Sequence, residues 1–163
     1  MDWRSRPRIG VIGGARPKPA FEAQALEVGR LIAEAGAILV CGGLSGVMTA
    51  AARGAREAGG LTIGILPGAA PGDANPYIDV AIATGLGYTR NALVVMNTDA
   101  VIAVDGEFGT LSEIAYGNIF SKPVVGLGTW EVKGVTPAKT PEEAVRLALK
   151  LAGRETAPRP GRK

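Results

Sequence analysis

The chain has 163 residues, of which 47% are hydrophobic and 20% charged, and its formal net charge is +3. It has no histidine and one cysteine, which excludes Ser-His-Asp and Cys-His nucleophilic schemes, histidine-ligated metals, thiolate zinc sites and an intramolecular disulfide. No apolar run reaches the ~18 residues of a membrane span, and MDWRSRPR lacks the apolar stretch of a signal peptide. We therefore expect one cytoplasmic domain with no metal site and no membrane contact.

Short apolar runs alternate with helical segments along the chain. Strands are predicted at Ile9–Ile12, Ile38–Cys41, Leu61–Leu66, Val80–Thr84, Ala100–Val104 and Val124–Leu127. Helices are predicted at Phe21–Ala35, Gly46–Ala58, Thr89–Asn97, Thr110–Phe120 and Pro141–Leu151. Because continuous apolar runs are typical of strands buried on both faces, the pattern predicts a doubly wound α/β fold, with a mostly parallel sheet and helices on both faces.

The chain reads as one domain over residues 1–153, with a basic segment at residues 1–8 and a disordered tail at residues 154–163. The proline- and glycine-rich stretch Leu66–Pro76 is the one long loop, and it predicts a lid or a crossover between halves of the sheet. Residues 9–152 hold 11 basic and 13 acidic residues, so the basic excess is terminal. We interpret these termini as solvated or disordered, and we do not expect nucleic-acid binding.

Three predicted strands run into glycine-rich loops: VIGG, VCGG and VDGEFG. Their glycines, with the one that follows the second loop, are Gly13, Gly14, Gly42, Gly43, Gly46, Gly106 and Gly109. Ligands of open α/β sheets bind outside the carboxyl ends of strands, where glycine lets them approach the backbone and helix N-termini attract anions. The pattern therefore favours a phosphate-bearing ligand, although neither GxGxxG nor GK[ST] is present.

Two charged residues lie where helices are predicted to begin. Thr110 and Glu113 fit a capping box, with threonine at the N-cap and glutamate three residues on. Glu113 is therefore either a cap, a residue of a phosphate site, or both. Arg90 and Asn91 follow another strand end, and a cation disfavours a helix N-terminus, so we interpret Arg90 as a group that holds a phosphate or a developing negative charge.

The motifs GLGYTRN, TDAVIAV, GxxGTLSEIA and KPVVGL follow one another in the second half of the chain. In order and spacing they resemble the LOG (Lonely Guy) superfamily of Rossmann-like, lysine decarboxylase-like proteins. Within it the chain is similar to a small bacterial branch that includes relatives of molybdenum cofactor carriers. The resemblance runs from Ile9 to about Leu127.

The resemblance implies an N-glycosidic hydrolase of nucleoside 5′-monophosphates that releases free base and ribose 5-phosphate. The superfamily signature is PGGxGTxxE, preceded by an arginine. By this resemblance, Glu113 is the catalytic carboxylate and Arg90 is its partner. By resemblance, Gly106, Gly109 and Thr110 hold the phosphate, and Gly42, Gly43, Gly46 and Met48 are similar to the family's segment along the nucleotide pocket. Gly13, Gly14 and Asn91, which lie at strand ends, complete the predicted ligand-binding residues. The resemblance also implies a homodimer or a higher homo-oligomer.

One departure from the signature keeps a second function open. Asp105-Gly106-Glu107 stands where the signature has PGG, and two carboxylates beside a dianionic phosphate repel it unless they face away or are neutralised. The alternative is a non-catalytic carrier or sensor of a phosphorylated, molybdopterin-type ligand. We thus expect no required cofactor, and a small phosphorylated ligand that is either a nucleotide or a molybdopterin-type molecule.

Overall fold

The structure is a computed structural model that describes residues 2–153. The tail predicted at residues 154–163 lies outside the described residues. The strands are β1 (Arg8–Gly13), β2 (Ile38–Cys41), β3 (Thr62–Leu66), β4 (Val80–Ala83), β5 (Ala100–Val104), β6 (Val124–Leu127) and β7 (Val135–Pro137). The helices are α1 (Pro19–Glu34), α2 (Val47–Glu57), α3 (Asn91–Met96), α4 (Phe108–Ile119) and α5 (Pro141–Leu151). Short 3₁₀ turns are η1 (Trp3–Ser5), η2 (Pro71–Asp73) and η3 (Gly87–Arg90).

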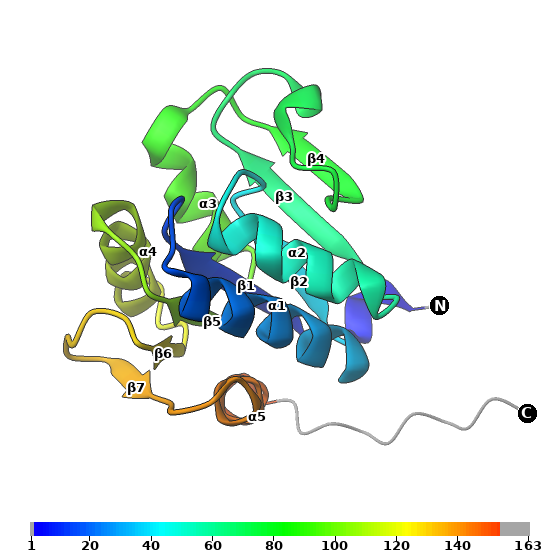
Figure 1. Cartoon of the computed structure of the whole chain (residues 1–163). Coiled ribbons are helices and arrows are strands. Elements are labelled where there is room, and N and C mark those ends of the chain that lie inside the picture. Colours follow the sequence, from blue (N-terminus) through cyan, green and yellow to red (C-terminus); the bar gives the residue numbers. More distant parts are fainter. Residues whose placement is uncertain (1, 154–163) are drawn as a thin grey trace, which may run out of the picture.

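The strands form one sheet in the order β4-β3-β2-β1-β5-β6-β7, and all its pairings are parallel. Helices α1, α2 and α5 cover one face, and α3 and α4 cover the other (Figure 1). The predicted doubly wound α/β fold is confirmed. The strand order reverses between β1 and β5, so their carboxyl ends border the crevice in which doubly wound proteins bind ligands.

The cap signals of α5 explain why its predicted bounds agree with the structure. Thr140 accepts a hydrogen bond from the Glu143 N–H at 3.2 Å, and the Glu143 carboxylate accepts one from the Lys139 N–H at 2.8 Å. Pro141 occupies the first turn, where its missing N–H has no helical partner to lose.

The sheet edges and the long loop differ from the prediction. Strand β4 is an edge strand whose Val80 and Ile82 are 43% and 46% exposed, so its apolar run does not reflect burial on both faces. Strand β7, with only three residues, was missed. The loop after β3 joins it to its neighbour β4 on one side of the switch point, so the expected crossover between halves of the sheet is wrong.

The basic N-terminal segment is ordered from residue 2 onward, which corrects the alternative of a disordered tail, while Arg4 and Arg8 are exposed to solvent. Arg6 donates hydrogen bonds to the carbonyl oxygens of Gly36 and Ala37 at 2.6 and 3.2 Å, beyond the end of α1. Its guanidinium also lies 4.8 Å from the ring centroid of Trp3. Arg8 begins β1 and pairs with Asp99. These arginines stabilise the fold. Within residues 2–153, no helix is both long and apolar enough to cross a membrane.

Candidate functional site

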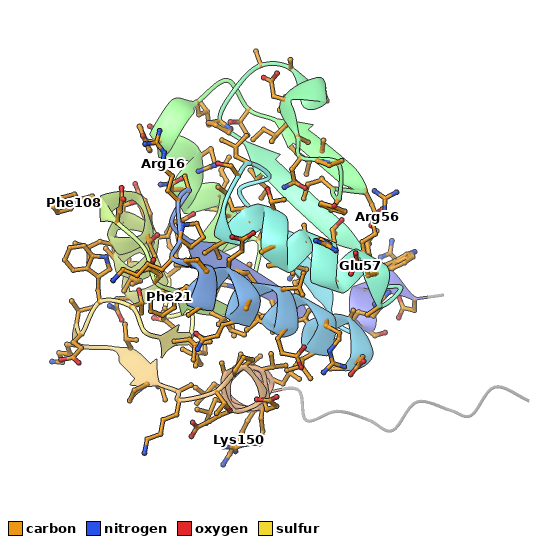
Figure 2. All side chains as sticks on the ribbon, viewed as in Figure 1. Arg16, Phe21, Arg56, Glu57, Phe108 and Lys150 are labelled. Carbon is orange, nitrogen blue, oxygen red and sulfur yellow. The ribbon has the colours of Figure 1, made fainter. Side chains whose placement is uncertain are left out.

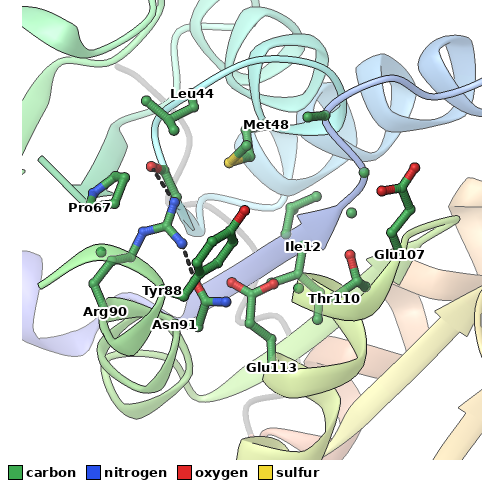
Figure 3. Close-up of a pocket in the computed structure, with 17 residues that line it drawn as sticks. Ile12, Leu44, Met48, Pro67, Tyr88, Arg90, Asn91, Glu107, Thr110 and Glu113 are labelled. Carbon is green, nitrogen blue, oxygen red and sulfur yellow. Dashed lines mark hydrogen bonds between the residues drawn. The ribbon is translucent and has the colours of Figure 1, made fainter.

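A cavity of about 420 Å³ lies at the carboxyl ends of β1, β2 and β5, at the switch point of the sheet (Figure 3). The glycine loops that follow these three strands converge on it because the strands are neighbours in the sheet. Nine of the predicted site residues line it: Gly13, Gly14, Gly42, Met48, Arg90, Asn91, Gly109, Thr110 and Glu113. The spacing of glycines at strand ends thus located the cavity.

The other three predicted glycines shape the loops behind the cavity wall. A Cβ on Gly43 would lie 2.6 Å from the Leu66 side chain, and one on Gly46 would lie 2.3 Å from the Gly14 carbonyl oxygen. Gly106 has φ +115°, and its Cβ would overlap Thr110 at 2.4 Å. These positions require glycine for backbone conformation and close approach.

Helix α4 begins at Phe108, two residues before the predicted start, so the capping-box interpretation is wrong. Glu107 is the N-cap residue and makes no side-chain cap bond. The Leu111 N–H donates to the Glu107 carbonyl oxygen at 3.0 Å, so the N–H groups of Phe108, Gly109 and Thr110 precede the helical ladder. Since Gly109 and Thr110 line the cavity, this first turn offers N–H groups and a positive dipole end to an anion.

Glu113 lies one turn deeper and is buried, with 7% of its surface exposed. Figure 3 shows its carboxyl group in the cavity between Asn91 and Thr110. Among the described residues the carboxyl group makes no hydrogen bond. Burial raises the pKa of Glu113 to about 8, and the nearby positive charge of Arg90 offsets only part of this rise. At neutral pH the group is therefore mostly a neutral acid that can donate a hydrogen bond.

Arg90 is buried, and its guanidinium is occupied by the protein itself. Its Nε donates to the Ile65 carbonyl oxygen at 2.7 Å, Nη2 donates to that of Gly42 at 3.2 Å, and Nη1 donates to Asn91 Oδ1. Three of the five N–H groups of the guanidinium thus tie the ends of β2 and β3 to η3. Arg90 supplies positive charge to the cavity wall, but most of its donors are not free for a phosphate. Its assignment as a catalytic residue stays a prediction, as does that of Glu113.

Asn91 connects this clamp to α4. Its Nδ2 donates to Ser112 Oγ at 3.1 Å, and the Ser112 hydroxyl donates to the Gly109 carbonyl oxygen at 2.6 Å. A chain of hydrogen bonds therefore runs from Arg90 to the first turn of α4, and it fixes that turn relative to η3.

The two carboxylates that replace the signature PGG occupy different places. Glu107 lines the cavity, whereas Asp105 is outside its lining. Figure 3 shows Glu107 on the side of the cavity opposite Arg90. The cavity therefore has one positive wall and one negative rim.

Sequence reasoning missed the apolar walls and the rim of the cavity. Ile12, Leu44 and Pro67 lie near strand ends and line it together with Tyr88, which is 86% exposed. Ligands of open α/β sheets bind outside the carboxyl ends of strands. Applied to side chains as well as to glycines, this rule could have identified Ile12, Leu44 and Pro67.

The topology and the crevice at its switch point define a Rossmann-like α/β protein. The chain belongs to the SLOG cluster4 family, whose family model matches residues 6–152. This confirms the resemblance found in the motifs and extends it to nearly the whole described chain.

Two solved structures are similar to this one over most of both chains. The molybdenum cofactor binding protein of Rippkaea orientalis superposes with a TM-score of 0.85 at 37% identity, and covers 91% of this chain and 98% of its own. The molybdenum cofactor carrier protein of Chlamydomonas reinhardtii superposes with a TM-score of 0.82 at 34% identity, and the match covers 91% of this chain and 99% of the carrier protein chain. DNA processing protein A of Helicobacter pylori, at 20% identity and a TM-score of 0.70 over 91% and 82%, shares the fold alone.

Two relatives match in sequence. An uncharacterised protein of Archaeoglobus fulgidus is 43% identical over 87% of this chain and 94% of its own length. A probable cytokinin riboside 5′-monophosphate phosphoribohydrolase of rice is 32% identical over 66% of this chain, but the match spans only 46% of the rice protein.

Proposed function

We propose that this protein binds a small phosphorylated ligand of the molybdenum cofactor type in the cavity at the switch point, and carries it without chemical turnover. The observation that carries the proposal is the first turn of α4, which opens into the cavity beside the buried, unpartnered Glu113. A helix N-terminus suits a phosphate group. The apolar side chains of Ile12, Leu44 and Met48 suit a planar ring.

The charge state of Glu113 favours binding over hydrolysis. A neutral carboxyl group does not repel a phosphate dianion and can donate a hydrogen bond to it, whereas an ionised one opposes binding. Cleavage of an N-glycosidic bond passes through an oxocarbenium-like state, which a carboxylate stabilises and a neutral acid does not. The large share of each carrier-type structure that this chain covers adds support.

A nucleoside 5′-monophosphate phosphoribohydrolase is the second candidate. It is favoured by the place of Glu113, beside the α4 turn and with a pKa of about 8, because a group that titrates near the working pH is suited to proton transfer. Incubation with AMP, GMP, CMP, UMP and a cytokinin monophosphate distinguishes the candidates. Free base that is released by the parent chain, and not by Glu113→Ala, would establish the hydrolase.

Gly109 allows the phosphate site to be tested without disturbing the fold. Its added Cβ would meet only Asn91 Nδ2, at 4.0 Å, so Gly109→Ala is expected to bind inorganic phosphate and AMP within about twofold of the parent. Gly109→Asp places an anion at the same turn, where it stabilises the helix but competes with the phosphate. We expect at least ~10-fold weaker binding and an unchanged or higher melting temperature.

Calorimetric titration and thermal unfolding of the three chains measure both quantities. Equal phosphate affinity of Gly109→Asp and Gly109→Ala would place the phosphate elsewhere and contradict the proposal. If Gly109→Asp unfolds at a lower temperature than the parent chain, the phosphate affinity of the parent is compared with that of Gly109→Ala, which keeps the fold.

The predicted homo-oligomer is also a proposal, and the outer side of α4 supports it. Phe108 and Ile119 are 78% and 68% exposed, and the only charged residue of α4 is the buried Glu113. Figure 2 shows Phe108 projecting away from the molecule. An uncharged, apolar helix face favours burial against a second copy. We expect sedimentation to give a dimer or larger, and Ile119→Asp to give a monomer; a parent chain that sediments as a monomer would contradict this.

A further inference from the structure

The loop between β6 and β7 contacts the backbone of the loop between β5 and α4. Thr129 Oγ1 donates to the Asp105 carbonyl oxygen at 2.6 Å, and Trp130 Nε1 donates to the Glu107 carbonyl oxygen at 3.2 Å. The Asp105 N–H also donates to the Leu127 carbonyl oxygen at 3.2 Å. Three backbone groups of the loop before α4 are thus held by residues 127–130.

These contacts determine which way the next N–H groups point. Described peptide bonds are all trans, and in a trans peptide the N–H points opposite to the C=O. Since the carbonyls of Asp105 and Glu107 face residues 129 and 130, the N–H groups of Gly106 and Phe108 point away from the β6–β7 loop. Gly106 adjoins the cavity lining, because a Cβ on Gly14, which lines the cavity, would be 3.7 Å from Gly106 Cα.

The loop before α4 needs such support because its backbone is strained. Asp105 has φ +52°, a left-handed conformation that side chains other than glycine adopt at a cost. Gly106 follows with φ +115°. A strained conformation persists where surrounding contacts fix it, and the hydroxyl of Thr129 lies on the carbonyl of the strained residue itself.

Packing holds the two donors in place. A Cβ on Gly126 would lie 2.9 Å from the Thr129 methyl group, so the methyl faces the strand and leaves the hydroxyl facing Asp105. The Trp130 ring lies 5.6 Å from the Phe108 ring, centroid to centroid, at the start of α4. Both residues therefore act on the α4 turn from behind, without lining the cavity.

We propose that Thr129 and Trp130 are positioning residues of the phosphate site, which turn the N–H groups of Gly106 and Phe108 toward the bound phosphate. This inference rests on the proposed function, because it assumes that the phosphate lies at the first turn of α4. The residues act through the backbone of the β5–α4 loop. They are outside the sequence motifs that indicated the site.

Thr129→Val and Thr129→Ser test the role of the hydroxyl. Valine keeps the methyl contact with Gly126 and removes the donor, while serine keeps the donor. For inorganic phosphate, we expect about five- to tenfold weaker binding to Thr129→Val and binding within about twofold of the parent for Thr129→Ser. In the ligand-free chains, the NMR amide chemical shifts of Gly106 and Phe108 are expected to differ from those of the parent in Thr129→Val and to match them in Thr129→Ser.

The outcomes separate this inference from the proposed function. Parent-like phosphate affinity in Thr129→Val, with only a lower melting temperature, would make Thr129 merely structural and leave the function intact. A parent chain that binds no phosphate would overturn both. If Thr129→Val fails to fold, Trp130→Phe provides the second test: it keeps an aromatic ring against Phe108, lacks the donor, and is expected to weaken phosphate binding by a similar factor. Affinity equal to that of the parent would overturn the inference.

Discussion

Glu113→Gln is expected to raise the free energy of unfolding by about 4–5 kcal/mol at pH 8.5 and to leave it nearly unchanged at pH 4. The pKa of Glu113 is raised from an ordinary 4.5 to about 8 by burial. Between these values the unfolded chain releases a proton that the folded chain retains, so stability falls as pH rises through this window and levels off above it. Glutamine resembles the neutral acid in shape and has no charged form to bury.

Urea denaturation at pH 4 and pH 8.5 measures the effect. Glu107→Gln is the matched control, because Glu107 is a carboxylate at the exposed rim of the same cavity; we expect its stability to follow the parent curve within about 0.5 kcal/mol. If the free energies of unfolding of the parent and of Glu113→Gln depended on pH in the same way, Glu113 would be ionised in the folded chain. The proposal that Glu113 is neutral in the folded chain would then be wrong.

The same ionisation predicts how ligand binding depends on pH. As pH rises above about 8, Glu113 becomes negative, and the affinity of the parent chain for inorganic phosphate is expected to fall. Glu113→Gln is expected to keep its affinity over that range. For a hydrolase the glutamine variant would instead lose base release at every pH.

Arg90→Met is expected to lower the free energy of unfolding by about 3–5 kcal/mol and to abolish phosphate binding. The substitution leaves the carbonyl oxygens of Ile65 and Gly42 without their buried donor, and it frees Asn91 from the chain of hydrogen bonds that fixes α4. Arg90→Lys is expected to recover little, since an ammonium group does not reproduce the planar fork.

Arg53→Met is the control for the loss of an arginine. Arg53 is exposed and pairs with Glu57 one turn away at 2.8 Å, and exposed pairs of this kind contribute little to stability because solvent screens them. Denaturant unfolding of the three variants gives the comparison. An Arg90→Met chain that is as stable as the parent would show that the guanidinium does not support the fold, and would return it to the role of a phosphate ligand.

The sequence predicted most of the sheet because its inner strands are covered by helices on both faces and are therefore continuously apolar. The same rule misread β4, where Val80 and Ile82 are exposed at an edge, and it gave no signal for the three residues of β7. Local caps predicted α5 well. At α4 the Thr110–Glu113 spacing imitated a capping box, while the turn at Gly106 and Glu107 started the helix earlier.

The site was predicted as far as strand ends and glycines could indicate it. The partners of Arg90 were not, because Ile65 and Gly42 are 25 and 48 residues away and only the fold brings them to the guanidinium. The neutral state of Glu113 also arises from burial, which no local motif encodes. Thr129 and Trp130 were not predicted for the same reason, since they contact carbonyl groups of a loop that is distant in the sequence.

Equilibrium ultrafiltration of the protein with molybdenum cofactor, with the released pterin quantified after denaturation, directly tests whether the protein binds the cofactor without turnover. We expect the parent chain and Gly109→Ala to retain about one cofactor per chain, recovered unchanged, and Gly109→Asp to retain almost none. Absence of retained cofactor on the parent chain, or equal retention by Gly109→Asp, would contradict the proposed function.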